Sequence, residues 1–241
     1  MLLRRALPSV FTVGNLFLGI ISIIVAFQGN FPWAAFLVII GMLLDGLDGR
    51  VARALNAQSE FGKELDSLSD VISFGVAPAF IMYGVVLNEI GWVGTVITAI
   101  FPICGALRLA RFNVATGTPN YFIGLPITAA GGVLATLALY HETMPSPNIV
   151  LPLFMLFLAY LMVSNIKYPN FKKVGIPRSA YYVVPIIIAV VATVFVLYPE
   201  QANKLVFLPL AVYAFYGVLK KKTKRVKQDN TQPFWKTRTK R

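Results

Sequence analysis

The sequence predicts an all-α membrane protein, a polytopic helix bundle with about eight transmembrane helices. The first reason is composition: 57% of the 241 residues are hydrophobic and only 13% are charged, whereas a soluble domain is about 45–50% apolar and about 25% charged. The second is the distribution of the apolar residues, which gather in long runs. A run of roughly 20 such residues is what a helix needs to cross a bilayer core.

The apolar runs define the expected spans. They cover residues 9–28, 32–54, 64–88, 91–112, 123–141, 149–165, 179–198 and 204–219. The third run begins with polar residues, and the fifth and sixth are short, with prolines near their ends. Six or seven spans therefore remain alternatives to eight.

The charged residues predict that both termini are cytoplasmic. In this orientation Lys204 is the one Lys or Arg on the outer side, together with Glu89, Glu142 and Glu200. Cytoplasmic loops of membrane proteins carry an excess of Lys and Arg. The pattern therefore selects this orientation, which requires an even number of spans.

The formal net charge of +12 has the same explanation. The basic residues lie between and after the apolar runs, where they set topology and meet anionic lipid. No nucleic acid partner is expected. Residues 1–219 form the predicted transmembrane domain, and the basic residues 220–241 are expected to be a disordered cytoplasmic tail.

Carboxylates concentrate in one stretch, residues 45–70, which runs from the second expected span into the third. Six of the ten Asp and Glu residues of the chain lie there: Asp45, Asp48, Glu60, Glu64, Asp66 and Asp70. Asp45 and Asp48 are three residues apart, so they share one face of a helix, as do Asp66 and Asp70 at a spacing of four. A turn between residues 54 and 62 would bring the two faces together.

Four aspartates in such a hairpin would repel one another strongly at low dielectric. All-oxygen ligation suits hard divalent ions such as Mg²⁺, Mn²⁺ or Ca²⁺, and no His or Cys is near enough in sequence to suggest zinc. Two such ions at a membrane surface indicate phosphoryl chemistry. A salt-bridge network with Arg50 and Arg53, or a divalent-cation transporter, are the alternatives.

Glycines accompany the aspartates. Gly46 and Gly49 flank Asp48 on a predicted helix, where glycine costs about 1 kcal/mol relative to alanine. Their missing side chains would let a bulky ligand approach the backbone, and Gly62 has the same expected role. The alternative is close packing of helices through small residues.

This hairpin resembles the CDP-alcohol phosphotransferases. Their pattern is D-x-x-D-G-x-x-A-R, eight residues, then G-x-x-x-D-x-x-x-D. The sequence matches every fixed position, with Asp45, Asp48, Gly49, Ala52, Arg53, Gly62, Asp66 and Asp70. Eight specified positions at the right spacing make this a specific signal.

The resemblance implies roles for these residues. Asp45, Asp48, Asp66 and Asp70 would hold two divalent cations, Mg²⁺ or Mn²⁺ with Ca²⁺ as an alternative, and Asp70 would also be the general base. The implied contacts to the CDP group come from Gly49, Arg53 and Gly62, and from Asn15 and Thr12 of the first span. The resemblance also implies a homodimer in a bacterial-type plasma membrane, with its active site at the cytoplasmic face.

Three further segments resemble the phosphatidylserine synthase branch of that family: GALRLARFNV (105–114), FIGLP (122–126) and MVSNIKYPNFKK (162–173). This implies CDP-diacylglycerol as the donor and L-serine as the acceptor. Because Arg can hold a carboxylate with two hydrogen bonds, the expected cations for serine or a donor phosphate are Arg108, Arg111, Lys167 and Lys172. Topological anchoring by these cations, and glycerol 3-phosphate or inositol as acceptor, remain open.

Overall fold

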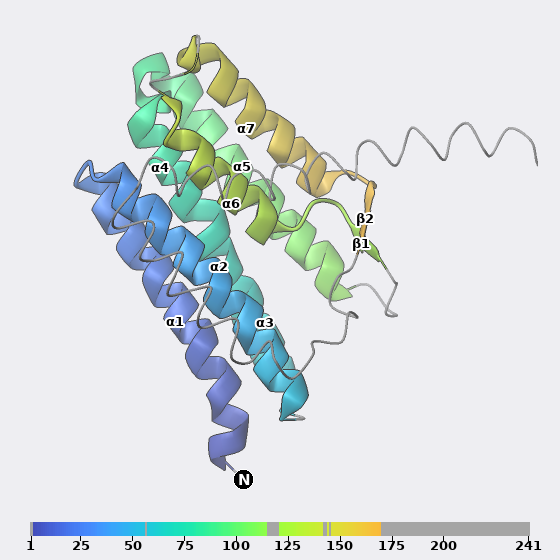
Figure 1. The fold of residues 1–241 in the computed structure, drawn as a ribbon. Coiled ribbons are helices and arrows are strands. Elements are labelled where there is room, and N and C mark those ends of the chain that lie inside the picture. Colours follow the sequence, from blue (N-terminus) through green and yellow to red (C-terminus); the bar gives the residue numbers. More distant parts are fainter. Residues whose placement is uncertain (1, 56, 115–120, 142–143, 145, 170–241) are drawn as a thin grey trace, which may run out of the picture.

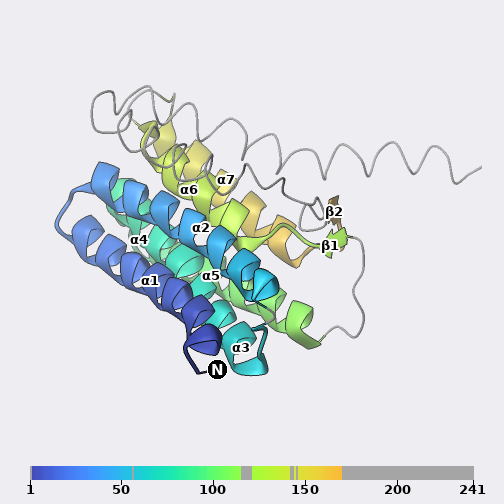
Figure 2. The same ribbon diagram turned by 60° about the horizontal axis from the view of Figure 1, so that its bottom comes forward.

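The computed structural model describes residues 2–55, 57–114, 121–141, 144 and 146–169. The helices are α1 (Leu2–Phe27), α2 (Phe31–Ala54), α3 (Glu60–Asp70), α4 (Ala77–Val85), α5 (Gly91–Val114), α6 (Ile127–Ala138) and α7 (Pro147–Val163). Short segments of other types are a π-helical turn (Val71–Val76), a 3₁₀ turn (Leu87–Ile90) and the strands β1 (Tyr121–Ile123) and β2 (Lys167–Pro169). In Figures 1 and 2 the α1–α2 pair lies along one side of the bundle and α7 on the other.

The helical bundle confirms the predicted class. Within the described residues, four helical segments are long and apolar enough to cross a membrane: Ser9–Phe27, Phe31–Ala54, Glu60–Val85 and Leu87–Val114. They correspond to the first four expected spans, and the chain is an integral membrane protein. Expected spans seven and eight, the basic tail and Lys172 lie outside the described residues, so the count of eight and the orientation stay predictions.

The fifth expected span is shorter than predicted. The expected range 123–141 contains a helix of only 12 residues, Ile127–Ala138. Ile123, where that span was expected to begin, is instead the last residue of β1, and residues 124–126 lie between β1 and α6. β1 pairs antiparallel with β2, with Phe122 opposite Tyr168 in the register. The sixth span, expected at 149–165, is the 17-residue helix α7. The two strands are the exception to the all-α prediction.

Helix α1 packs closely on the elements that carry the acidic residues. Its main partner is α2, and it also contacts α3 and the π-helical turn. A Cβ atom at Gly19 would lie 2.7 Å from the Cα atom of Ser73. This glycine therefore brings the α1 backbone close to the π-helical turn.

The π-helical turn begins directly after Asp70. It covers Val71–Val76, and its side chains Ser73 and Phe74 are buried. A Cβ at Gly131 of α6 would overlap the carbonyl oxygen of Phe74, so α6 packs against the turn from the other side. Such turns are rare within helices and frequently mark functional sites.

Candidate active site

The carboxylates of three aspartates, two on α2 and one on α3, lie close together. Asp45, Asp48 and Asp66 can each offer a carboxylate oxygen, and these oxygens lie within 4.8 Å of one another. Asp48 is buried, whereas Asp45 and Asp66 are partly buried. We call these residues the three-aspartate group. The structure thus joins the two helix faces that the sequence pattern singled out.

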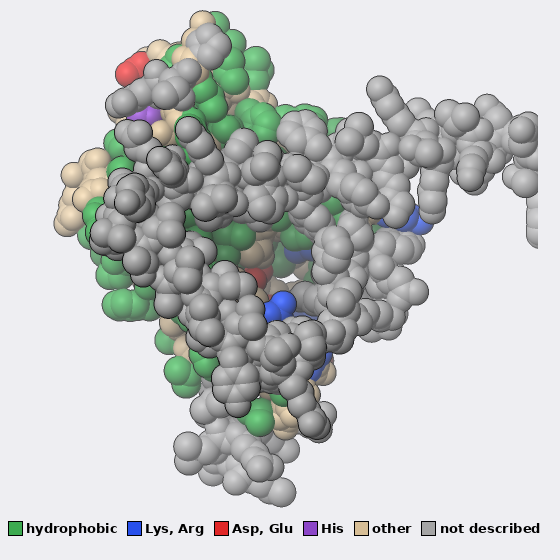
Figure 3. Space-filling model, viewed as in Figure 1, with side chains coloured by type: hydrophobic (Ala, Val, Ile, Leu, Met, Phe, Trp, Pro, Cys, Tyr) green, Lys and Arg blue, Asp and Glu red, His purple; other side chains and the backbone are tan. Residues whose placement is uncertain are grey.

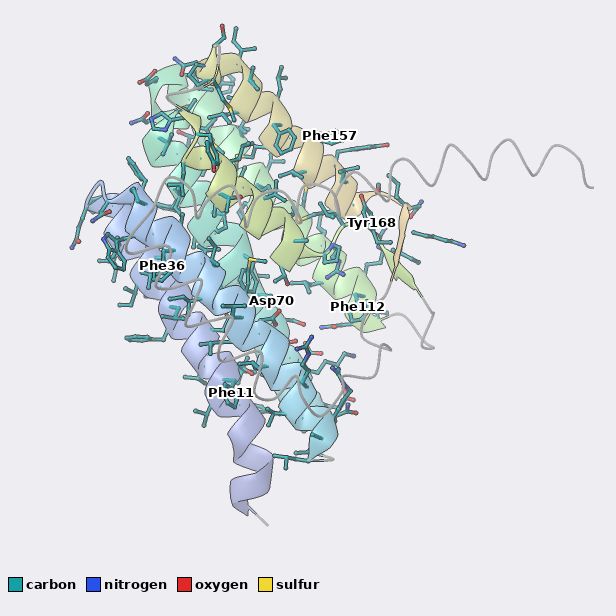
Figure 4. All side chains as sticks on the ribbon, in the orientation of Figure 1. Phe11, Phe36, Asp70, Phe112, Phe157 and Tyr168 are labelled. Atoms are coloured by element: carbon teal, nitrogen blue, oxygen red, sulfur yellow. The ribbon has the colours of Figure 1, made fainter. Side chains whose placement is uncertain are left out.

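Asp70 ends α3 one turn after Asp66 and is 7% exposed. Its carboxylate is not part of the three-aspartate group among the described residues. Figure 4 shows it inside the bundle. The last of the four expected ligands therefore lies deeper along the same helix.

The donor set of the three-aspartate group fits a hard divalent cation. All of its donors are carboxylate oxygens, which Mg²⁺, Mn²⁺ and Ca²⁺ prefer. Three carboxylates this close together, one of them buried, repel one another, and a cation bound between them would offset this repulsion. The residues present therefore suit the expected metal.

A cavity of about 510 Å³ opens beside this group. Its size falls within the range of about 300–1,000 Å³ that is usual for small-molecule sites. Its lining residues, which define the α2–α3 cavity, are Asp48, Gly49, Ala52, Arg53, Gln58, Ser59, Glu60, Gly62, Lys63, Asp66 and Phe112. Two aspartates and the predicted CDP contacts Gly49, Arg53 and Gly62 thus line the same cavity.

Packing does not explain Gly46 and Gly49 of α2. A Cβ atom at Gly46 would meet nothing within 4 Å, and one at Gly49 would meet only the Nη1 atom of Arg53, at 3.7 Å, among the described residues. Gly49 lines the cavity. The structure therefore favours ligand access over close helix packing as the reason for glycine at this position.

Gly62 has a local structural role as well. Ser59 caps α3, and its Oγ atom accepts a hydrogen bond from the Gly62 backbone N–H at 3.0 Å. A Cβ atom at Gly62 would lie 3.1 Å from that oxygen, which is tighter than ordinary contact. Glycine thus suits both the cap and the cavity wall.

The two polar residues expected from the first span, Thr12 and Asn15, are both buried in the bundle. The Thr12 hydroxyl donates a hydrogen bond to Oδ2 of Asp48 at 2.9 Å. Asn15 is completely buried, and its side-chain Oδ1 and Nδ2 atoms have no hydrogen-bond partner among the described residues. Neither residue is among the described residues lining the α2–α3 cavity.

Two serines that the sequence analysis did not single out attach α1 to this region. The Ser69 hydroxyl donates to the backbone oxygen of Thr12 at 3.2 Å. The Ser73 hydroxyl donates to the backbone oxygen of Asn15 at 2.9 Å. Their spacing of four residues, beside Asp66 and Asp70 at the same spacing, is the signal that could have identified them.

The two arginines of α5 differ in their surroundings. Arg108 is buried, and its guanidinium carbon lies 5.4 Å from the centre of the Phe112 ring. Arg111 instead donates four hydrogen bonds, from Nη1 to the backbone oxygen of Val163 and Oδ1 of Asn165, and from Nη2 to the backbone oxygens of Ile123 and Ser164. Arg111 thus links α5 to the segments at β1 and at the end of α7.

Lys167 is exposed on β2. Nearer the cavity, Lys63 donates from Nζ to the backbone oxygen of Asn113 at 3.3 Å, and Asn113 donates from Nδ2 to Oγ of Ser67 at 2.9 Å. These contacts fix the end of α5 against α3. Phe112 is thereby held at the cavity wall (Figure 4).

Comparison with known proteins decides between the candidate classes. The family model described as CDP-alcohol phosphatidyltransferase matches residues 5–217. The chain belongs to this family. The predicted metal ligands and cavity residues of the phosphatidyltransferase fold all fall within the matched range. Membership in a transferase family decides against the divalent-cation transporter and against a purely structural salt-bridge network.

Several curated relatives of this phosphatidyltransferase cover most of the chain. The CDP-diacylglycerol–serine O-phosphatidyltransferase of Helicobacter pylori is 43% identical over 219 residues, which are 88% of this chain and 90% of that protein. The Bacillus subtilis protein of the same name is 40% identical over 167 residues, 69% of this chain and 92% of that protein. The archaetidylserine synthase of Methanothermobacter thermautotrophicus is 37% identical over 172 residues, 70% and 72% of the two chains.

Proposed function

We propose that this chain transfers the phosphatidyl group of CDP-diacylglycerol to the hydroxyl of L-serine, giving phosphatidylserine and CMP. The observation that carries the proposal is the three-aspartate group beside a cavity that also presents Gly49 and Arg53. The choice of serine is supported by the names of relatives that align with 69–88% of this chain.

The proposed metal ligands are the three-aspartate group and Asp70. Together they would hold two divalent cations, Mg²⁺ or Mn²⁺, with Ca²⁺ as the alternative. Bound there, the cations would supply positive charge to the oxygens of the attacked phosphate and of the departing CMP. The carboxylate donor set and the spacing of its three members support this assignment.

Asp70 is the proposed general base. It would take the proton of the serine hydroxyl while the hydroxyl oxygen forms a bond to the phosphorus of the phosphatidyl group. The bond from that phosphorus to the CMP oxygen breaks in the same displacement. The position of Asp70, one turn after Asp66, supports this role, and a positioned base contributes about 10²–10⁴-fold to rate.

The α2–α3 cavity is the proposed site for the CDP group. Arg53 would bind the diphosphate, whose charge matches its guanidinium group. Gly49 and Gly62 would let the nucleotide approach the backbone. The buried amide of Asn15 is a proposed deeper contact to the donor, because a polar group without a hydrogen-bond partner is costly unless a ligand satisfies it.

Arg108 is the proposed cation for the serine carboxylate. It is buried one turn before Phe112, which lines the α2–α3 cavity. The hydrogen bonds of Arg111 to three backbone oxygens favour the anchoring role for that residue. Lys167 and Lys172 stay proposed contacts to a phosphate or carboxylate at the cytoplasmic surface.

The active site is proposed to face the cytoplasm, in a homodimer of the bacterial-type plasma membrane with both termini inside. In Figure 3 the visible Lys and Arg side chains lie around the middle of the molecule together with an acidic side chain, while the histidine and another acidic side chain lie at the top. The excess of Lys and Arg in the segments expected to be cytoplasmic supports this orientation. The acyl chains of the donor would stay in the bilayer.

The test is a transfer assay with purified protein, CDP-diacylglycerol, serine and Mg²⁺ or Mn²⁺. Equal amounts of CMP and phosphatidylserine are expected from the wild type. Asp70→Asn and Asp66→Asn should each lose at least about 100-fold in rate. Glu64→Gln, which changes an exposed carboxylate on the same helix, is the matched control and should keep its rate. Full activity in Asp66→Asn would contradict the site.

A further inference from the structure

We propose that Thr12 is a positioning residue that holds the carboxylate of Asp48 ready for a divalent cation, and that it does not contact the nucleotide. This inference rests on the proposed function, because it assumes that the three-aspartate group binds metal. It goes further because it gives helix α1 a role in positioning the metal ligands. Helix α1 supplies no member of the three-aspartate group.

The hydrogen bond from Thr12 to Asp48 crosses from α1 to α2. Its length is 2.9 Å, and both residues are buried, with exposed fractions of 4% and 5%. A threonine hydroxyl has only one hydrogen to donate. Since Asp48 receives it, Thr12 could meet a cytosine or a ribose only as a hydrogen-bond acceptor.

This bond restricts the rotation of the Asp48 carboxylate. Oδ2 accepts from Thr12, so the second carboxylate oxygen can turn toward Asp45 and Asp66. Side chains that hydrogen-bond to a metal ligand orient it and raise metal affinity, and their loss typically costs about 10–100-fold. Thr12 has the geometry of such a partner.

The same residue also ties α1 to α3. The backbone oxygen of Thr12 accepts a hydrogen bond from Ser69, which is completely buried. Ser69 lies three residues after Asp66 and next to Asp70 on the same helix. One residue of α1 therefore sets the positions of carboxylates on two different helices.

Thr12 lies apart from the cavity proposed for CDP. The described lining residues of that cavity come from α2, α3, the turn between them and Phe112 of α5. Asp48 is both a lining residue and the acceptor of the Thr12 hydrogen bond. Thr12 therefore acts on the cavity through Asp48.

The test measures Mn²⁺ binding to the purified full chain without nucleotide or lipid substrate, by electron paramagnetic resonance of the free ion. Thr12→Val, which keeps the shape and removes the hydroxyl, should weaken binding by about 10–100-fold. Thr12→Ser restores the donor and should bind within a few-fold of the wild type. Thr136→Val is the matched control: this threonine is also fully buried, but its hydroxyl bonds to its own helix backbone at Gly132.

Thermal unfolding is followed for every variant. If Thr12→Val does not fold, Thr12→Ala removes the same hydroxyl without adding bulk and carries the same expectation. Wild-type Mn²⁺ affinity in a folded Thr12→Val protein would overturn the proposal, and weakened binding of CDP alone would make Thr12 a nucleotide contact. An Asp66→Asn protein that binds Mn²⁺ like the wild type would instead overturn the metal site of the proposed function, and this role with it.

Discussion

The guanidinium carbon of Arg108 lies 5.4 Å from the centre of the Phe112 ring, one helical turn further along α5. The arginine is buried, and the ring lines the α2–α3 cavity. A cation over an aromatic face is stabilised by about 0.5–2 kcal/mol, more when water is excluded. The ring thus holds a buried positive charge close to the cavity in which the reaction is proposed.

Replacing Arg108 tests its role toward the acceptor. In Arg108→Gln the KM for serine should rise by about 10–100-fold, because a charged hydrogen-bonded pair contributes about 1.5–3 kcal/mol. Arg108→Lys should not restore it, since an ammonium group cannot reproduce the two-pronged geometry. Steady-state CMP release at varied serine gives the KM, and an unchanged value in Arg108→Gln would contradict the assignment.

Arg111 should behave in the opposite way. Its four hydrogen bonds join α5 to β1 and to the end of α7, so Arg111→Gln should destabilise the fold by at least about 2 kcal/mol. The KM for serine should stay near the wild-type value in protein that remains folded. Thermal unfolding in detergent measures the first effect, and a raised KM at unchanged Tm would assign Arg111 to the acceptor instead.

Gly49→Ala should separate stability from activity. Alanine favours a helix by about 1 kcal/mol over glycine, and within the described part of the chain a Cβ there meets no atom closer than Nη1 of Arg53 at 3.7 Å. The Tm should rise, while the added methyl group in the cavity wall should raise the KM for CDP-diacylglycerol at least about tenfold. Gly46→Ala is the control, expected to raise Tm at unchanged KM; equal kinetics in both variants would contradict ligand access at Gly49.

Replacing Gly124 tests how tightly β1 packs against the end of α7, where Arg111 donates hydrogen bonds to both segments. The φ angle of Gly124 is +79°, and a Cβ there would overlap the Met162 carbonyl oxygen and lie 3.0 Å from Nη2 of Arg111. Gly29 has a similar φ of +83°, but a Cβ there would meet no atom of the described residues within 4 Å. Gly29→Ala should cost about 1–2 kcal/mol of conformational energy, and Gly124→Ala clearly more. Equal Tm values for the two variants would show that the backbone near Met162 moves aside at little cost, which would contradict tight packing between β1 and α7.

The sequence was sufficient for the long helices and for the aspartate hairpin. The first four expected spans needed only run length, and the spacing of Asp45 and Asp48 on one helix brings both to Asp66 on the next. The spans depend only on local sequence, and the aspartate group depends on two helices that are neighbours in the chain. Both follow from helical periodicity and from one short turn.

What the sequence did not reveal depends on contacts between distant segments. The fifth span was expected to start at residue 123, yet Ile123 belongs to the strand 121–123, which pairs with 167–169. Arg111 bonds mostly to backbone oxygens, which have no signature in sequence. The nucleotide contact that the family resemblance implies for Thr12 stays a prediction, and the sequence did not reveal the hydrogen bond from Thr12 to Asp48.

The most direct test of the proposed function compares acceptor alcohols. Purified protein in liposomes with CDP-diacylglycerol and Mg²⁺ or Mn²⁺ is given serine, glycerol 3-phosphate or inositol, and CMP release is followed beside Asp70→Asn. Release that depends on serine, yields phosphatidylserine and is lost in Asp70→Asn is the predicted result. Release with glycerol 3-phosphate or inositol but not with serine would contradict the proposed acceptor.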